Sequence, residues 1–179
     1  MKIRKTKFKD LLIIKHELFP DERGYFKELI KKEPLEKILG YEIEFCQQNY
    51  VNSKLNVLRG LHFQNHPNAQ SKLISVHKGK ILDVAVDIRL KSKTYGKYFS
   101  YVLSSDQNES LFIPKGFAHG YLTLSNDASV SYLVDNYYCP ELESGIKFND
   151  KFLNIDWGTK ESIIKTSLKD KNLGSFNEK

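Results

Sequence analysis

The stretch Leu82-Asp83-Val84-Ala85-Val86-Asp87-Ile88-Arg89 alternates aliphatic side chains with acidic, small or basic ones. This period of two residues is typical of a β-strand, in which successive side chains point to opposite faces of the sheet. Residues 98–103 and 128–134 are rich in β-branched and aromatic residues and predict further strands. Turn signals such as Lys78-Gly79-Lys80 and Pro114-Lys115-Gly116 separate these segments. Many short strands at such spacing predict an all-β protein, an antiparallel sandwich or barrel of which the jelly roll is one form.

The chain length of 179 residues fits a single domain over residues 1–179, and no repeat or linker interrupts it. Hydrophobic residues make up 40% of the chain and charged residues 28%, so the chain can bury enough apolar surface to fold. One short helix is predicted over residues 32–40, because Pro34 suits a first helical turn and Gly40 the position just past the end. The lysine-rich segment from about residue 159 is weakly patterned and predicts a C-terminal arm.

Several classes of protein are disfavoured by the composition. The longest fully aliphatic run, Leu11 to Ile14, is far shorter than the about 20 residues of a membrane span. Residues 1–10 alternate basic residues with others and lack the apolar core of a secretory signal. Two cysteines, Cys46 and Cys139, are too few for a disulfide scaffold or a four-cysteine zinc site. We therefore expect a soluble, cytoplasmic protein without a membrane partner.

The formal net charge of +6 invites comparison with nucleic-acid-binding proteins. Much of the excess lies in residues 1–10, where residues 5–9 alternate lysine with Thr6 and Phe8. That pattern is typical of an edge strand that lysines protect from aggregation. Because the basic residues are not mixed with stacking aromatic residues on one face, we expect no nucleic-acid partner. The remaining basic residues suit a phosphate-bearing small ligand equally well.

Four segments carry more unusual polar residues than a β-sandwich core requires, and they are residues 21–28, 56–74, 113–121 and 131–138. The first is also explained as a charged turn. Arg59 and His62 flank Gly60 in an apolar run, and burying them without partners is costly, so they face a pocket or each other. A hydrogen-bonded core histidine explains His62 equally well. His119 stands between small residues, which leaves space for a ligand, whereas Tyr132 shares a strand face with Val130 and Val134 and fits a packing role.

Metal-dependent and nucleophilic chemistry find little support in the sequence. His62 and His66 are four residues apart, but there is no His-x-His pair and no glutamate at ligand spacing near His62. The chain has no G-x-S-x-G elbow, no G-x-G-x-x-G turn and no phosphate-binding loop of the ATPase type. We therefore expect neither a metal nor a dinucleotide cofactor.

Taken in order along nearly the whole chain, the polar motifs form a pattern. The sequence resembles the dTDP-4-dehydrorhamnose 3,5-epimerases in the blocks Asp21-x-Arg23-Gly24-x-Phe26-x-Glu28, Phe45-x-Gln47-x-Asn49, residues 57–64, Gln70-x-Lys72-Leu73, residues 82–89, Ser92-x-Thr94-Tyr95-Gly96, Ile113-Pro114-x-Gly116-Phe117-Ala118-His119-Gly120, Tyr132 with Tyr137-Tyr138, and Asn149-Asp150 ahead of Ile155-x-Trp157. The resemblance implies a jelly-roll (cupin-type) homodimer that works without a metal or an organic cofactor.

The resemblance also implies an acid–base reaction on a nucleotide-linked 4-keto sugar, whose carbonyl acidifies the hydrogens on carbons 3 and 5. By resemblance His62 is the base, a role that suits histidine as a residue type near neutral pH. Asp170 would orient its ring, and Tyr132 would return the proton from the opposite side. Lys72 would stabilise the oxyanion that develops during the reaction.

The other matching residues are implied to bind the substrate. Arg23, Arg59 and Lys169 would neutralise the diphosphate. Tyr138 would stack or hydrogen-bond at the nucleotide, and the remaining sugar- and nucleotide-positioning residues would be Glu28, Gln47, Asn49, His119 and Glu143. In a regular strand Arg59 and His62 point to opposite faces. Their shared role therefore predicts a bulge or bend, placed at Gly60.

The sequence departs from the family pattern at Gln48, Tyr50-Val51, Ser71, Gly158 and Leu168. These departures spare the implied base, acid and oxyanion lysine, so they bear on the nucleotide and sugar more than on the reaction. The leading hypothesis is inversion of carbons 3 and 5 of dTDP-4-dehydro-6-deoxy-D-glucose. Alternatives are a GDP-linked keto-heptose, inversion at one carbon only, or a non-catalytic cupin-type module that binds sugar nucleotides.

Overall fold

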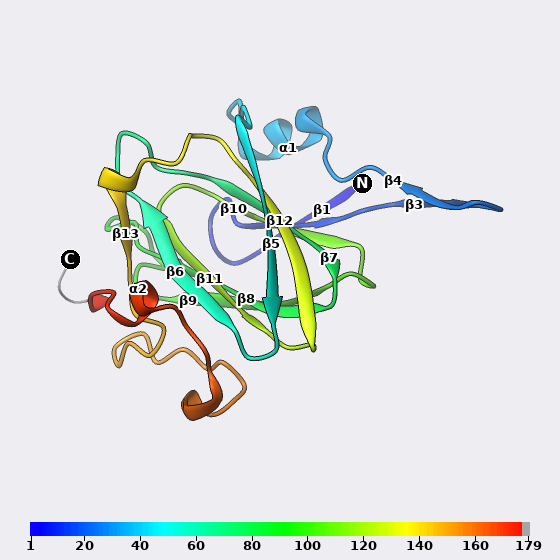
Figure 1. Ribbon diagram of the computed structural model, residues 1–179. Coiled ribbons are helices and arrows are strands. Elements are labelled where there is room, and N and C mark those ends of the chain that lie inside the picture. Colours follow the sequence, from blue (N-terminus) through cyan, green and yellow to red (C-terminus); the bar gives the residue numbers. More distant parts are fainter. Residues whose placement is uncertain (177–179) are drawn as a thin grey trace.

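Two antiparallel sheets face each other in the computed structural model, which describes residues 1–176 (Figure 1). One sheet has six strands in the order β1-β2-β10-β7-β12-β5, and the other has five in the order β13-β6-β11-β8-β9. A separate two-stranded hairpin consists of β3 and β4. Sequence neighbours are scattered across both sheets, as expected for a jelly roll. The predicted all-β, cupin-type jelly roll is confirmed.

The strands predicted within residues 82–89, 98–103 and 128–134 are present as β8, β9 and β12. The strands are β1 Lys2–Lys5, β2 Leu12–Lys15, β3 Leu18–Asp21, β4 Gly24–Lys27, β5 Gln47–Lys54, β6 Leu58–Gln64, β7 Lys72–Lys78, β8 Lys80–Asp87, β9 Tyr98–Ser104, β10 Glu109–Ile113, β11 Phe117–Thr123, β12 Asp127–Val134 and β13 Glu143–Gly145. The helices are α1 Lys32–Leu39 and α2 Leu168–Lys171, and the 3₁₀ turns are η1 Pro140–Leu142 and η2 Glu161–Ile163. The predicted helix over 32–40 is confirmed, with Gly40 closing it in the left-handed conformation.

Three apolar layers cover the faces of the two sheets. The main core lies between them and includes Ile74, Ala85, Leu111 and Val130. A second layer covers the outer face of the five-stranded sheet, where residues 146–176 pack onto Val84 and its neighbours. A third layer lies under α1, on the outer face of the six-stranded sheet. Both faces of β8 are therefore covered, and Asp83 and Asp87, which share a face with Ala85, are fully buried.

Residues 159–176 run back along the domain. Short parallel bridges join Lys165 to Val57 and Gly174 to Ile146, and Phe176 is buried in the second apolar layer. This path brings α2 against β6. The C-terminal segment thereby contributes a wall to the region described below.

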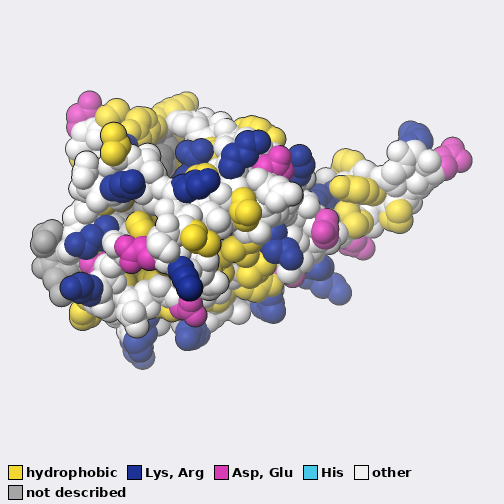
Figure 2. Space-filling view, turned by 60° about the horizontal axis from the view of Figure 1, so that its bottom comes forward, with side chains coloured by type: hydrophobic (Ala, Val, Ile, Leu, Met, Phe, Trp, Pro, Cys, Tyr) yellow, Lys and Arg dark blue, Asp and Glu magenta, His cyan; other side chains and the backbone are white. Residues whose placement is uncertain are grey.

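The hairpin of β3 and β4 extends away from the rest of the molecule (Figures 1 and 2). It carries hydrophobic side chains in full view of solvent, and Tyr25 and Phe26 are 65% and 64% exposed. Phe19 lies beside Phe26 on the paired strand. Exposed aromatic residues on a two-stranded extension are typical of a surface that a partner covers.

One prediction about the N-terminus is wrong. The edge strand is β1, Lys2–Lys5, rather than residues 5–9. Residues 6–11 instead form a turn in which Thr6 bonds Leu11 and Asp10 has a positive φ of 66°. Phe8 is then buried in the main core while Lys7 and Lys9 stay exposed. No helix within residues 1–176 is long and apolar enough to cross a membrane.

Candidate active site

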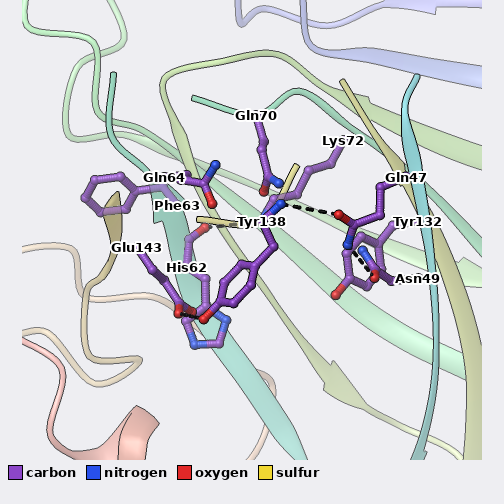
Figure 3. Close-up of a pocket in the computed structure, with 10 residues that line it drawn as sticks. All are labelled: Gln47, Asn49, His62, Phe63, Gln64, Gln70, Lys72, Tyr132, Tyr138 and Glu143. Atoms are coloured by element: carbon purple, nitrogen blue, oxygen red, sulfur yellow. Dashed lines mark hydrogen bonds between the residues drawn. The ribbon is translucent and has the colours of Figure 1, made fainter. Parts of the chain in front are cut away.

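A polar cleft opens between the two sheets. It consists of two hollows, with cavity volumes of about 210 Å³ and 270 Å³, that share His62, Lys72 and Tyr132 in their walls. His62 comes from β6 of the five-stranded sheet, while Lys72 and Tyr132 come from β7 and β12 of the six-stranded sheet. Figure 3 shows His62 and Tyr132 on different sides of the pocket. The residue types suited to acid–base chemistry thus meet in one place.

His62 and Asp170 form a hydrogen-bonded pair. His62 Nε2 lies 2.8 Å from Asp170 Oδ1, and the backbone N–H of Gly60 donates to Asp170 Oδ2 at 3.3 Å. Burial raises the pKa of Asp170, but the hydrogen bond and charge of His62, aided by Gly60 and Ser167, outweigh it and lower the pKa. The carboxylate is therefore held ionised, with the imidazole ring fixed against it.

The short helix α2 brings Asp170 to the cleft. Ser167 caps the helix by accepting a hydrogen bond from the backbone N–H of Asp170 at 3.0 Å. Asp170 is buried, whereas its neighbours Leu168 and Lys169 are exposed. A single helical turn thus presents one carboxylate inward at a position 108 residues from its partner in sequence.

The predicted bulge at Gly60 is confirmed. Along β11, His119 pairs with His62 and Tyr121 with Arg59, so three steps in β6 match two in β11. Gly60 has a φ of +116°, and a Cβ there would lie 2.6 Å from both the Cα of Gly120 and the carbonyl oxygen of His119. Only glycine fits this close approach. The extra residue turns Arg59 and His62 toward the same cleft, which both line.

Lys72 is the cation of the cleft interior. Its Nζ donates a long hydrogen bond of 3.4 Å to the carbonyl oxygen of His62. Burial lowers the pKa of Lys72 to about 8, against the opposing effect of the carboxylates of Asp83 and Glu143. Near neutral pH the ammonium is charged and poorly hydrated, which is the state that best stabilises a new negative charge.

Tyr132 is half-buried and shares a face with Val130, as its strand phase predicts. Burial raises the pKa of Tyr132, the phenol of Tyr121 raises it further, and the guanidinium of Arg59 opposes the shift. The phenol therefore keeps its proton across the physiological pH range. Arg59 itself is held by donating from Nε to Ser53 Oγ at 2.9 Å.

The outer rim of the cleft is a chain of hydrogen bonds. Gln47 donates to Asn49 Oδ1 at 2.9 Å and accepts from the backbone N–H of Tyr138 at 3.2 Å (Figure 3). The Tyr138 hydroxyl and the Lys169 ammonium both donate to Glu143. Burial raises the pKa of Glu143, but the bonds from Lys169 and Tyr138 outweigh it and lower the pKa. A carboxylate at the mouth thus links strand β13 to α2.

Sequence reasoning missed one deeply placed residue. The Asp83 carboxylate lies 3.1 and 3.0 Å from His119 Nε2 through its two oxygens. Burial lowers the pKa of His119, against the opposing charge and hydrogen bond of Asp83. The sequence contains a signal for it, because Asp83 and Asp87 are acidic residues within a predicted strand whose other residues are mostly apolar. Its neighbour Asp87, by contrast, is paired with Arg89, Ser92 and Thr94.

Two predicted binding residues lie away from the cleft of their own chain. Arg23 is in the turn of the β3–β4 hairpin, where its guanidinium pairs with Asp21 at 2.6 Å. Glu28 follows β4 and pairs with Lys31 at 2.8 Å. The other eleven predicted residues line the cleft, whereas the hairpin extends outward from it (Figure 1), so the binding roles of Arg23 and Glu28 stay predictions. Within residues 1–176 no group of three or more His, Cys, Asp or Glu side chains is arranged to hold a metal ion.

Comparison with known proteins agrees with the geometry. A family model described as dTDP-4-dehydrorhamnose 3,5-epimerase matches residues 5–178. The chain belongs to this family. Its members are epimerases, so the chain is an enzyme of the isomerase class.

Individual epimerases match over nearly their full length. The dTDP-4-dehydrorhamnose 3,5-epimerase of Escherichia coli is 44% identical over 178 residues, which are 99% of this chain and 96% of that protein. The crystal structure of the Elizabethkingia anophelis epimerase superposes with a TM-score of 0.96 at 44% identity, covering 100% of this chain and 98% of that one. A Legionella pneumophila dTDP-6-deoxy-D-glucose-3,5-epimerase was solved in complex with dTDP-4-keto-L-rhamnose, and it has a TM-score of 0.93 at 41% identity, covering 98% and 93%. The epimerase described here thus spans the whole fold of its relatives.

Proposed function

We propose that this epimerase inverts carbons 3 and 5 of dTDP-4-dehydro-6-deoxy-D-glucose to give dTDP-4-dehydro-L-rhamnose. The observation that carries the proposal is the placement of His62 and Tyr132 on opposite sheets across one cleft, with Lys72 in its wall. A base and an acid on opposite faces of a sugar ring are what inversion requires. The product complex of the Legionella pneumophila enzyme supports this choice of substrate.

In the proposed reaction His62 takes the proton from carbon 3 or carbon 5. With Nε2 bonded to Asp170, the other ring nitrogen is left to accept that proton, and the carboxylate stabilises the resulting imidazolium. The electron pair of the broken C–H bond moves into the carbonyl at carbon 4 as an enolate. Tyr132, which keeps its phenolic proton, then delivers it to the opposite face of the same carbon.

Lys72 would hold the enolate oxygen. A charged donor in a site that excludes water stabilises an oxyanion far better than the same group does in water. Because the pKa of Lys72 is lowered to about 8, the protonated form is present below that pH and is lost above it. We therefore expect the rate to fall as pH rises through about 8.

The rim residues would bind the rest of the substrate. Arg59 and Lys169 supply positive charge for the diphosphate, in the hollow that also contains His119. Exposed Tyr138 offers a ring face for the nucleotide base. The sugar- and nucleotide-positioning set is completed by Gln47, Asn49, His119 and Glu143, all of which line the cleft.

We propose further that the active form is a homodimer in which the β3–β4 hairpin of one copy reaches the cleft of the other. The support is the pattern of the hairpin, which exposes Phe19, Tyr25 and Phe26 to solvent. It also carries Arg23, a cation suited to a diphosphate, whose partner within residues 1–176 is Asp21 on the same hairpin. Glu28 at the base of the hairpin would join the same shared site.

A cytoplasmic location is part of the proposal. The thiols of Cys46 and Cys139 are free, and free thiols persist in the reducing cytoplasm. Cell fractionation checks this point separately from the chemistry.

The substrate is tested by identifying the products. Purified enzyme is incubated with dTDP-4-dehydro-6-deoxyglucose, and the mixture is reduced with borohydride, hydrolysed and separated by chromatography. Rhamnose and its carbon-4 epimer are expected, because only inversion at both carbons gives them. A GDP-linked substrate serves as the parallel reaction. Products inverted at one carbon would make the protein a single-centre epimerase, and conversion of the GDP sugar alone would reassign the nucleotide.

A further inference from the structure

We propose that Asp83 is a positioning residue of this site, whose buried carboxylate orients His119 and supplies the counter-charge for Lys72. The inference rests on the proposed function of the cleft, in which Lys72 must be charged. It concerns a residue that lines neither hollow and touches substrate only through others.

The position of Asp83 is set by the five-stranded sheet. On β8 it pairs with Tyr121 of β11, while Ala85 pairs with His119. Asp83, Ala85 and the two β11 residues therefore point to the same face, toward the space between the sheets. Both oxygens of Asp83 lie within 3.1 Å of His119 Nε2, and the carboxylate has no exposed surface. A carboxylate buried to this extent needs a compensating charge.

His119 does not supply that charge at neutral pH. Its pKa is lowered by burial, and the charges of Lys72 and His62 lower it further. The ring is therefore neutral and offers Asp83 a hydrogen bond only. The cation whose protonated form Asp83 favours is Lys72, which lines the same hollow as His119, the hydrogen-bond partner of Asp83.

Other charged groups near Lys72 are already engaged. Together with Asp83, the titratable and charged groups that line the two hollows around Lys72 are Arg59, His62, His119, Tyr121, Tyr132, Tyr138, Glu143, Lys169 and Asp170. Asp170 is bonded to His62, and Glu143 accepts from both Lys169 and Tyr138. The hydrogen-bond partner of Asp83 is His119, and the charge of Asp83 favours the protonated form of Lys72.

The same contact fixes the tautomer of His119. With Nε2–H donated to a carboxylate, the lone pair of Nδ1 is left to accept a hydrogen bond, and His119 lines the cleft. A sugar hydroxyl fits that acceptor. An asparagine at position 83 can donate its amide N–H to Nε2 as well as accept from it, so it permits the reversed tautomer, with a proton on Nδ1.

The test compares Asp83→Asn with wild type in the pH dependence of solvent exchange at the substrate. We expect the high-pH decline of the rate to move to lower pH by about one pH unit, which is the scale of a lost neighbouring charge. KM is expected to rise as His119 reverses its hydrogen bonding. In a Lys72→Met background the same change should have little further effect on the rate, because both act through one ammonium.

Asp87→Asn is the matched control. It removes a buried carboxylate from the same strand, but one paired with Arg89 outside the cleft. Its melting temperature is expected to fall, whereas its pH profile should follow wild type. An Asp83→Asn enzyme with the wild-type profile and the wild-type KM would overturn the proposal.

A measurement on the unaltered protein keeps the proposal testable if Asp83→Asn does not fold. Nitrogen-15 NMR of histidine-labelled enzyme reports which ring nitrogen of His119 carries the proton. Protonated Nε2 with unprotonated Nδ1 is the expected result, and the reverse tautomer would overturn the proposal. Wild-type enzyme that fails to exchange any 4-keto substrate would instead refute the proposed function, since the tautomer is measured without substrate.

Discussion

At the scale of single residues, burial in the cleft shifts the pKa values of the phenol and the ammonium in opposite directions. Burial raises the pKa of Tyr132, which preserves its proton, and lowers that of Lys72 to about 8, which leaves its charge poorly solvated. A buried ammonium is expensive for the folded state, and that cost is what makes it effective against a developing oxyanion. Stability and catalysis therefore oppose each other at Lys72.

Replacing Lys72 with methionine should make the protein more stable and inactive. The folded-state pKa of about 8 lies below the ordinary 10.5, so the cost is full below pH 8 and disappears as pH rises toward 10.5. At about 1.4 kcal/mol per pKa unit, the gain in unfolding free energy at pH 7 is on the order of 3 kcal/mol. Turnover should fall roughly 100-fold or more, the scale of one lost oxyanion donor.

Urea denaturation and steady-state rates measure both effects. Lys78→Met, on the exposed end of the same strand, is the control and should change stability by no more than about 0.5 kcal/mol. A Lys72→Met protein that is less stable than wild type would contradict this prediction, because it would show that the interactions of the ammonium outweigh the cost of burying its charge.

Replacing Tyr132 with phenylalanine should separate the two halves of the reaction. Proton abstraction needs His62 and Lys72, so exchange of the substrate hydrogens with solvent should persist in part. Net inversion should be lost, because the opposite face has no donor. Deuterium incorporation is followed by mass spectrometry beside product analysis, and unchanged formation of the inverted product would rule out this role for Tyr132.

At the scale of elements, the bulge in β6 allows two residues of one strand, Arg59 and His62, to line the same cleft. Without the extra residue at Gly60, Arg59 and His62 would lie on opposite faces of the sheet. The bulge also brings the Gly60 N–H to Asp170, so strand, bulge and α2 hold the imidazole together.

A Gly60→Ala substitution should disrupt this arrangement, and Gly158→Ala provides the comparison. Both glycines have positive φ, but a Cβ at Gly158 meets nothing within 4 Å, whereas one at Gly60 meets Gly120 and His119 backbone at 2.6 Å. Gly158→Ala should cost about 1–2 kcal/mol of backbone strain alone. Gly60→Ala should cost about 3 kcal/mol or more and lower turnover about 100-fold, since the base is displaced.

Thermal melts and rates of the two variants decide this point. The prediction would be contradicted if both variants lost the same stability and Gly60→Ala kept full activity. Glycine would then be needed at position 60 only for its positive φ, and the bulge would not position His62.

Much of the fold was predictable from local pattern. Strand alternation over residues 82–89 and the Pro34–Gly40 signals gave β8 and α1 near their observed bounds. The alternation did not reveal that both faces of β8 are covered, because the covering layer comes from residues 146–176, which have little pattern of their own. Asp83 was missed because that layer covers the aliphatic face of β8, which leaves the opposite face, with Asp83 and Ala85, toward the space between the sheets.

The site was predictable where a motif carries its own geometry. Gly60 between Arg59 and His62 required a bulge, and the structure has one. Arg23 and Glu28 were assigned to the cleft by motif alone, yet nothing in the sequence tells whether a charged hairpin folds over its own chain or extends from it. That choice depends on the whole molecule.

At the scale of the whole molecule, the hairpin is the feature that a single copy does not explain. It exposes aromatic side chains on a thin extension and carries charged residues that suit the substrate (Figure 2). Two copies related by a twofold axis would each donate one hairpin and receive one, because a closed dimer uses the same surface twice.

Complementation between inactive variants tests the exchange of hairpins. His62→Ala and the double variant Arg23→Ala/Glu28→Ala are co-expressed with different tags, and heterodimers are purified through both. If the hairpin serves the partner, each heterodimer contains one intact cleft and one with both lesions, so activity should return to about half the wild-type value per dimer. Activity that stays at the level of the parent variants would place Arg23 and Glu28 in a role within their own chain.

The most direct test of base catalysis by His62 is proton NMR in deuterated water with dTDP-4-dehydro-6-deoxyglucose and catalytic enzyme. Wild type should replace the hydrogens on both carbon 3 and carbon 5 with deuterium. His62→Ala should abolish replacement at both positions while binding dTDP within about tenfold of wild type, since the ring contributes little to the ground-state affinity. Full exchange in the His62→Ala variant would contradict the assignment of the base, and absence of exchange in wild type would contradict the proposed reaction.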